Sequence, residues 1–253
     1  DTFQYASVEL ADDLQFVSQL IRDQRIPENN DVHAAMNFVV QWASGRLRAN
    51  ETIARLTVGR AGITLRSLMW NMKDEEEIVL IAVRQNGLAL EYASRRLRNT
   101  ISVCTAAVMQ DGLSLEYCAA HFKNSEELVL RALITDSQAL QFASDELKDN
   151  LGFIKRALDT RLDTFLWASN RIYSSPVMIA DILRDYSVLR YASLGVKDDY
   201  DLVLIAVQHD GMQIEYASFR LRGDPQIVSA AIAQNPEAHI HARQDSWSIL
   251  QDS

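Results

Sequence analysis

The sequence predicts an all-α fold, an α-solenoid of about nine tandem helix-turn-helix repeats with a period of 25 residues. The first observation is self-similarity, because the segment LALEYASRRLRN at residues 88–99 recurs along the chain around an aromatic anchor. The second is that apolar residues between the anchors follow helical spacing. The third is composition: nine glycines and four prolines in 253 residues are too few for a strand-rich fold. The clearest anchors, each 25 residues from the next, are Tyr92, Tyr117, Phe142 and Trp167.

The N-terminal part carries the motif with an insertion. The motif is present at residues 3–7 around Tyr5, so we expect the sequence to start inside a repeat, as a fragment, a processed product or the ordered part of a longer chain. The next anchor, Trp42, follows 37 residues later, which is one period plus twelve. The extra residues, at about 24–35, include Pro27 and two asparagines, and this composition indicates a surface insertion loop.

The register of the repeats then continues from Trp42 to Tyr216 and on to a last position at His241. Around His241 the motif is lost, and terminal repeats diverge because one of their faces meets water instead of a neighbour. We therefore expect a single helical repeat array over residues 1–253, with a degenerate C-terminal cap at about 236–253.

The first helix of each repeat is delimited by its end residues. A side chain that can cap a helix stands eight residues after most anchors, and Pro176 and Pro225 directly follow two of these caps, at a position that suits proline. In the repeat that starts at Glu75, Asp74 could serve as the cap. A glycine five residues before many anchors, such as Gly87, is typical of a helix C-terminus with positive φ. The capping residues are Asp13, Asn50, Thr100, Ser125, Asn150, Ser175, Asp199 and Asp224.

These signals predict two helices of about eleven residues per repeat, for example residues 75–85 and 88–98. The first is apolar around most of its girth, and the second is amphipathic, with Glu91 and Arg95 opposite the apolar face. Neither helix can bury its apolar face alone, so we expect successive pairs to stack. The predicted apolar face of the second helix comprises Ala89, Leu90, Tyr92, Ala93 and Leu97.

The repeat consensus, L-x-x-A-v-x-x-n-G-x-x-L-x-Y-A-S-x-x-L-r-x-d, resembles a tandem repeat family catalogued as a domain of unknown function. Its clearest copies are residues 80–99, 130–149 and 204–224. The resemblance implies an all-helical array, and occurrence in intracellular bacterial pathogens and in algae and other protists. It implies no catalytic residue, because the family has no established activity.

Composition narrows the classes of partner. The net charge of −9 disfavours nucleic acid as a partner, because phosphate binding needs an excess of Lys and Arg. No apolar run has the roughly 20 residues that span a bilayer. The two cysteines, Cys104 and Cys118, are too few for a disulfide framework and are expected to be buried thiols. We expect a reducing compartment, such as the cytoplasm or the interior of an organelle.

Catalytic and metal sites are not expected, and no cofactor is predicted. The serine of the Y-A-S motif recurs without a repeating histidine, so we interpret its hydroxyl as bonded to a carbonyl one turn back. His239 and His241 lack the spacing and the further ligands of a metal site. The strongest candidate for an enzymatic cluster consists of titratable residues at successive helix ends: Arg184, Asp185, His209 and Asp210.

One set of residues departs from the pattern, because large apolar side chains occupy positions that the second helix turns to solvent. A row of such residues in register is typical of a partner-binding surface. The alternative is that local rotation or a second layer of the chain buries them. The predicted partner-binding residues are Trp70, Leu166, Tyr173, Leu194 and Phe219.

The function predicted from these observations is a non-catalytic scaffold for protein–protein interaction. Its partner would be another protein or a multi-subunit complex. The chain would act either as an accessory subunit of a larger assembly or as the recruiting module of a secreted effector. The alternative is an enzyme or regulatory domain with a site in the groove of the solenoid.

Overall fold

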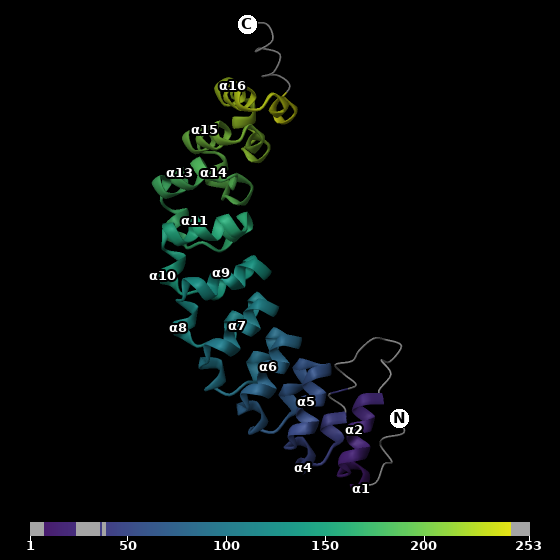
Figure 1. The fold of residues 1–253 in the computed structure, drawn as a ribbon. Coiled ribbons are helices and arrows are strands. Elements are labelled where there is room, and N and C mark those ends of the chain that lie inside the picture. Colours follow the sequence, from purple (N-terminus) through teal and green to yellow (C-terminus); the bar gives the residue numbers. More distant parts are fainter. Residues whose placement is uncertain (1–7, 24–35, 37–38, 244–253) are drawn as a thin grey trace. The chain divides into compact units, whose positions relative to one another are not determined.

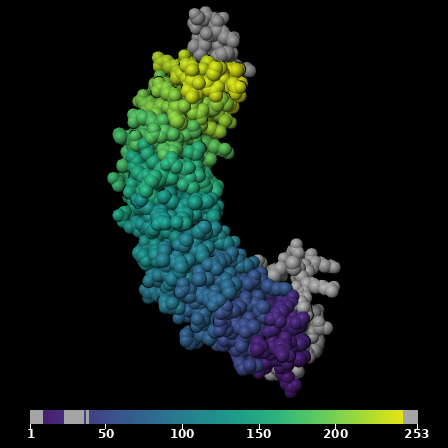
Figure 2. All heavy atoms as spheres, viewed as in Figure 1, coloured from purple at the N-terminus to yellow at the C-terminus, as the bar shows by residue number. Residues whose placement is uncertain are grey.

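The computed structural model of the chain describes residues 8–23, 36 and 39–243, and every regular element in these residues is helical (Figure 1). The chain divides into two compact units, Asp1–Ala143 and Ser144–Ser253, and each is described by itself. In each unit the side chains of successive repeats close over the spaces between the helices (Figure 2). The predicted insertion loop at about 24–35 lies outside the described residues.

The first unit contains α-helices and 3-10 helices (η). They are α1 Val8–Ala11, α2 Leu14–Asp23, α4 Gly45–Arg48, α5 Glu51–Arg60, η2 Gly62–Ser67, η3 Met72–Asp74, α6 Glu76–Gln85, η4 Gly87–Tyr92, η5 Leu97–Asn99, α7 Ile101–Gln110, η6 Gly112–Tyr117, α8 Ala120–Lys123, α9 Glu126–Thr135 and η7 Ser137–Phe142. Residues 39–42 are also helical.

The second unit repeats the same order of elements. They are α10 Asp145–Lys148, α11 Leu151–Thr160, η8 Leu162–Trp167, α12 Asn170–Tyr173, α13 Pro176–Asp185, η9 Leu189–Tyr191, α14 Leu194–Lys197, α15 Tyr200–His209, η10 Gly211–Tyr216, η11 Leu221–Gly223, α16 Pro225–Gln234 and η12 Pro236–His241. Residues 236–241, predicted to be a degenerate cap, therefore keep the 3-10 helix of the other repeats. Residues 244–253 lie outside the described part.

The long helix of each repeat forms as predicted. α6 has ten residues, and it packs against α5 on one side and α7 on the other, so both of its faces are covered. Its buried side chains are Ile78, Val79, Ala82 and Val83. In the first unit α5, α6, α7 and α9 follow one another in this way, as α13, α15 and α16 do in the second (Figure 1). Stacking of this kind buries apolar surface that no single pair of helices could cover.

The predicted second helix is wrong, because two shorter elements take its place. Residues 87–92 form a 3-10 helix of six residues, the chain becomes extended at Ala93 (φ −67°, ψ 155°), and one further turn follows at Leu97–Asn99. The backbone N–H of Ser94 donates to the Lys73 carbonyl of the preceding repeat (2.9 Å). In a continuous helix that N–H would bond within its own repeat. The break therefore exchanges a local hydrogen bond for one between repeats.

The recurrent glycine is required by close packing and not by a left-handed backbone. None of the glycines of the structure's described residues has a positive φ, so that prediction is wrong. A Cβ built on Gly87 would lie 2.5 Å from the carbonyl oxygen of Ala107 in the next long helix. A Cβ built on three other glycines would lie at least as close to a carbonyl oxygen of the next long helix; these are Gly62 with Ala82, Gly112 with Ala132 and Gly211 with Ala231. Only a residue without a side chain allows this approach.

A glutamine at the end of the next long helix completes the junction. The N–H of Gly87 donates to Gln110 Oε1 (2.5 Å), and Gly211 makes the same bond to Gln234 (2.6 Å). The amide nitrogen of Gln234 in turn donates to the His209 carbonyl of the preceding repeat (3.1 Å). Each such glutamine thus bonds two backbone groups that the end of a helix leaves without partners.

Most of the predicted caps are confirmed. Asp13, Asn50, Ser125, Asn150, Ser175, Asp199 and Asp224 accept from backbone N–H groups of the following turn. Pro176 and Pro225 begin α13 and α16. Thr100 is an exception, because its hydroxyl donates to the Arg96 carbonyl instead (3.0 Å). Asp74 does not cap α6; its carboxylate bonds across to the next repeat.

Two further predictions can be compared with the structure. Cys104 and Cys118 are buried, free thiols, as expected. None of the described helices has the length and apolar character needed to cross a bilayer.

Candidate functional site

The predicted partner-binding residues differ in exposure. Leu194 is 84% exposed and Trp70 77%, and Leu166 and Phe219 are also exposed. Tyr173 is half-buried: its hydroxyl donates to the Phe165 carbonyl, and the two rings lie 5.0 Å apart. Burial raises the pKa of Tyr173 to about 12. Tyr173 therefore packs within its own repeat, and the other four side chains are available on the surface.

Three of the exposed residues occupy the same place in their repeats. Trp70, Leu194 and Phe219 each stand three residues after the anchor position, where the single turn begins. Leu194 and Phe219 take this place in neighbouring repeats of the second unit. The guanidinium of Arg243 lies over the ring of Phe219, 4.4 Å from its centroid, so one face of that ring is covered by a cation.

The serine of the Y-A-S motif has a role that the sequence analysis misassigned. The hydroxyl of Ser94 donates to the Asp74 carboxylate of the preceding repeat, and its oxygen accepts from the N–H of Leu97 (3.2 Å). Arg96 Nε binds the same carboxylate at 3.1 Å. The predicted bond to a carbonyl one turn back is therefore wrong. We call this arrangement of aspartate, serine and arginine the inter-repeat triad.

The inter-repeat triad occurs at three junctions of the described residues: Asp12 with Ser44 and Arg46, Asp74 with Ser94 and Arg96, and Asp198 with Ser218 and Arg220. It lowers the pKa of each aspartate. The Ser94 hydroxyl has the largest effect on Asp74 and the Ser218 hydroxyl on Asp198, whereas Arg46 has the largest effect on Asp12. The three residue types at these positions are not sufficient to form a triad. Asp149, Ser169 and Arg171 have the same positions, but Ser169 only caps α12.

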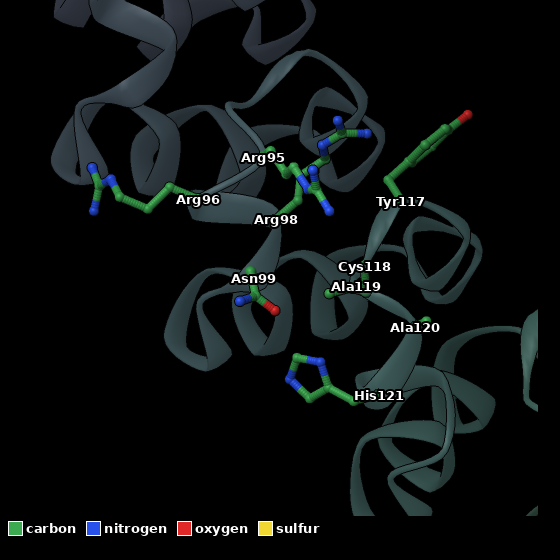
Figure 3. Close-up of a pocket in the computed structure, with 9 residues that line it drawn as sticks. All are labelled: Arg95, Arg96, Arg98, Asn99, Tyr117, Cys118, Ala119, Ala120 and His121. Atoms are coloured by element: carbon green, nitrogen blue, oxygen red, sulfur yellow. The ribbon is translucent and has the colours of Figure 1, made fainter.

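The junction that follows the Asp74 triad in the chain has no triad. It has an open cavity of about 600 Å³ instead (Figure 3). Asn99, Ala119 and His121 stand where the aspartate, serine and arginine would be. Ala119 has no hydroxyl with which to cap α8. The cavity is lined by Arg95, Arg96, Arg98, Asn99, Tyr117, Cys118, Ala119, Ala120 and His121.

The lining of the cavity is rich in cations without counterions. The side chain of Arg96 points away from the other lining residues, towards Asp74 (Figure 3). In the part of the chain that the structure describes, no carboxylate pairs with Arg95 or Arg98. Arg98 Nε is buried without a hydrogen-bond partner, as are the Nε atoms of Arg48 and Arg222 at the same repeat position. The lining of the cavity therefore includes two guanidiniums that pair with no described carboxylate, on a chain whose net charge is −9.

One wall of the cavity is apolar. Cys118 is 5% exposed there, and the Cys104 thiol beside it lies 3.2 Å from the Arg98 carbonyl. The hydrogen bond with Cys104 and burial both raise the pKa of the Cys118 thiol. The ring of His121 contacts that of Phe122, with 4.0 Å between centroids and a tilt of 46° between the planes. Cys118 thus stays uncharged and contributes an apolar contact.

The cluster that sequence analysis singled out for catalysis is used for packing. Lys155 Nζ binds Asp181 and Asp185 at 2.7 Å each, which joins α11 to α13. The hydroxyl of Tyr186 bonds the Lys155 carbonyl and the Asp159 carboxylate. At this junction Leu162 stands where other repeats have the close-packing glycine, and long side chains make the connection instead.

Arg184 and His209 lie near Asp185, because after Lys155 their charges also lower the pKa of that carboxylate. Asp210 caps η10 and accepts from the Ser187 hydroxyl, whereas Arg184 lies 4.0 Å from Asp181. The Nδ1 atom of His239 lies 2.6 Å from the Pro236 carbonyl. Within residues 8–23, 36 and 39–243, no three metal-ligating side chains gather at one place.

Sequence analysis missed the cavity, although a signal was present. The copy LSLEYCAAHFKN at residues 113–124 has Ala119 and His121 where the regular copies have serine and arginine. It also missed Met109 and Ile134, which are exposed at equivalent positions of α7 and α9. Those residues lie on the long helix, which the pattern had assigned to the interior.

Comparison with known proteins gives a family and no closer relative. The model of one family, described as Domain of unknown function (DUF4116), matches residues 75–123, 125–173, 177–219 and 199–238. Each of the first two segments spans about two 25-residue periods, and together the matches cover more than half of the chain. No curated protein and no solved structure matches the chain. The chain therefore belongs to the family described as Domain of unknown function (DUF4116).

Proposed function

We propose that this protein is a non-catalytic scaffold that binds another protein or a multi-subunit complex through exposed apolar residues of its short turns. The observation that carries the proposal is the exposure of Leu194 and Phe219 at equivalent positions of neighbouring repeats. Large apolar side chains in such a row favour a partner, because burying them against a second protein removes apolar surface from water. Trp70 and Leu166 extend the predicted surface within their own units.

The recurring polar side chains support a scaffold over an enzyme. The serines and aspartates of the triads form hydrogen bonds from one repeat to the next. The glutamines at the ends of the long helices accept from backbone N–H groups of the preceding repeat. Lys155, Asp185 and Asp210 also serve packing or capping. An enzymatic site needs titratable residues that are free to act at a cleft, and the two carboxylates of the strongest candidate cluster already bond to other groups of the chain.

The proposal includes a continuous array. We propose that the repeats over residues 1–253 form one α-solenoid of about nine repeats with the 25-residue period. The tandem family matches and the repeated junctions within each unit support it. Small-angle scattering of the chain tests it: a scattering profile of an elongated particle fits one array, and two independently tumbling globules would contradict it.

The experiment on partner binding compares two matched double variants of the tagged chain. L194D/F219D places acids at the predicted surface, where Asp145 and Asn170 already occupy the equivalent positions of other repeats. I101D/V177D adds the same charge at two other exposed apolar residues, each in the first turn of a long helix. We expect affinity purification from native extract to lose the partner only with L194D/F219D, with both variants melting as the wild type does.

The outcomes also distinguish the two settings of the proposed scaffold. Partners recovered at fixed stoichiometry would indicate an accessory subunit, whereas a single substoichiometric partner would indicate an effector that recruits it. Equal recovery of partners by both double variants would exclude Leu194 and Phe219 from the binding surface. A large loss of stability in L194D/F219D would show that these side chains are part of the core.

A further inference from the structure

We propose that the cavity between Asn99 and His121 binds a phosphate group, either as the free ion or on a small organic molecule. This site is separate from the apolar surface of the proposed function and does not depend on it. Its volume of about 600 Å³ lies in the range of small-molecule sites, ~300–1,000 Å³.

The junction that holds the cavity differs from the three junctions that a triad closes. At Asp74, Ser94 and Arg96 the same space is closed by a carboxylate that accepts from a hydroxyl and a guanidinium. In the cavity Asn99, Ala119 and His121 take those positions, so the negative group is missing while the backbone keeps its path. The N–H of Ala119 still donates to the Arg98 carbonyl (3.0 Å), as that of Ser94 does to Lys73. The vacant volume is therefore a property of side chains, on an unchanged framework.

The cavity also differs from the closed junctions in the charge of its lining. Arg95 stands at the place that Trp70, Leu194 and Phe219 occupy in other repeats, and it brings a second unpaired guanidinium beside that of Arg98. The buried Nε of Arg98 recurs at Arg48 and Arg222, so it belongs to the repeat position. What distinguishes the cavity is Arg95 and the absence of an acidic partner. Two cations on the lining of one cavity favour an anion that neutralises both.

Phosphate is the anion whose oxygens and charge match the two guanidiniums best. A guanidinium offers a planar fork of N–H donors that matches two oxygens of a phosphate, and two guanidiniums match its double charge. The Asn99 amide and the His121 ring add further polar groups to the lining. Cys118, Ala119 and Tyr117 add apolar surface, which an organic group attached to the phosphate could contact. A carboxylate would use fewer of these donors.

The test is isothermal titration calorimetry of the full chain with inorganic phosphate and with phenyl phosphate, at constant ionic strength. We expect saturable binding of phosphate, and at least a tenfold loss of affinity in R95Q/R98Q, because both charge-assisted forks are removed. R222Q is the matched control, since Arg222 has the same repeat position and the same buried Nε but does not line the cavity. Its affinity should equal that of the wild type.

A second variant keeps the proposal testable if R95Q/R98Q does not fold. N99D/A119S/H121R rebuilds the inter-repeat triad inside the cavity, so it should fold and should lose binding of both probes. Phenyl phosphate binding several-fold more tightly than inorganic phosphate would assign the site to a phosphorylated organic molecule, and equal affinities would assign it to the free ion. No saturable heat with either probe, or unchanged affinity in N99D/A119S/H121R, would overturn the proposal.

Discussion

Two successive junctions of the first unit share a framework, and the side chains at the three triad positions differ between them. At the closed junction Gly62 packs on α6, and Asp74, Ser94 and Arg96 form a triad. At the open junction Gly87 packs on α7 in the same way, but Asn99, Ala119 and His121 leave a cavity. The comparison teaches that the glycine and the backbone hydrogen bonds set the spacing of repeats. The polar positions are then free to close a junction or to open a site.

The largest expected effect tests whether both junctions depend on the glycine contact. G62A and G87A each place a methyl group against a carbonyl of the next long helix, where the backbone has no room to yield. We expect each substitution to lower the free energy of unfolding by about 2–3 kcal/mol, as overpacking of a tight contact does. Urea denaturation followed by circular dichroism measures it.

G45A is the control for the glycine variants, because nothing lies within 4 Å of a Cβ built on Gly45. Its stability should match or slightly exceed that of the wild type, since alanine is the better helix former at the first residue of α4. A loss in G62A and none in G87A would show that the open junction is not held by the same contact. The shared framework of the comparison would then be wrong.

A smaller effect concerns the serine at which the junctions differ. S94A removes the cap of the turn at Leu97 and the hydroxyl that binds Asp74, and we expect a loss of about 1 kcal/mol. A119S adds a hydroxyl where α8 has no side-chain cap, and we expect a gain of ~0.5–1 kcal/mol. The two changes should shift the midpoint of urea unfolding in opposite directions. Shifts of the same sign would mean that the residue acts through something other than the cap.

Sequence analysis predicted what depends on one repeat alone. Helical periodicity located α6 to within one residue, and capping chemistry at Asn50 and Ser175 located helix starts, because these effects act between residues a few positions apart. The recurrent position of Gly87 before the anchor was recognised, but the reason for the glycine was misassigned. A positive φ and a close approach by another segment both select glycine, and only coordinates separate them.

The features that could not be predicted depend on contacts between one repeat and the next. The predicted helix at 88–98 breaks at Ala93 because the N–H of Ser94 finds the Lys73 carbonyl, which no local propensity reports. The cavity has the same origin. Ala119 and His121 are unremarkable residues by themselves, and they leave a vacant volume only because Asn99 of the preceding repeat faces them. The half-burial of Tyr173 likewise depends on its contacts with the ring and the carbonyl of Phe165.

The smallest expected effect is the acid sensitivity of the closed junction. The Ser94 hydroxyl, followed by Arg96, lowers the pKa of Asp74 below its usual value of 3.8, so the carboxylate favours the folded chain above that pH. This contribution is lost as the pH falls through the lowered pKa, because both states are then protonated. D74N should therefore lose less stability than the wild type between about pH 5 and pH 2, measured as the urea midpoint at each pH. D149N is the matched control, since the Asp149 carboxylate has the same repeat position and Ser169 does not bond to it. An acid dependence of D74N as steep as that of the wild type would show that the exposed triad closes the junction by shape and not by charge.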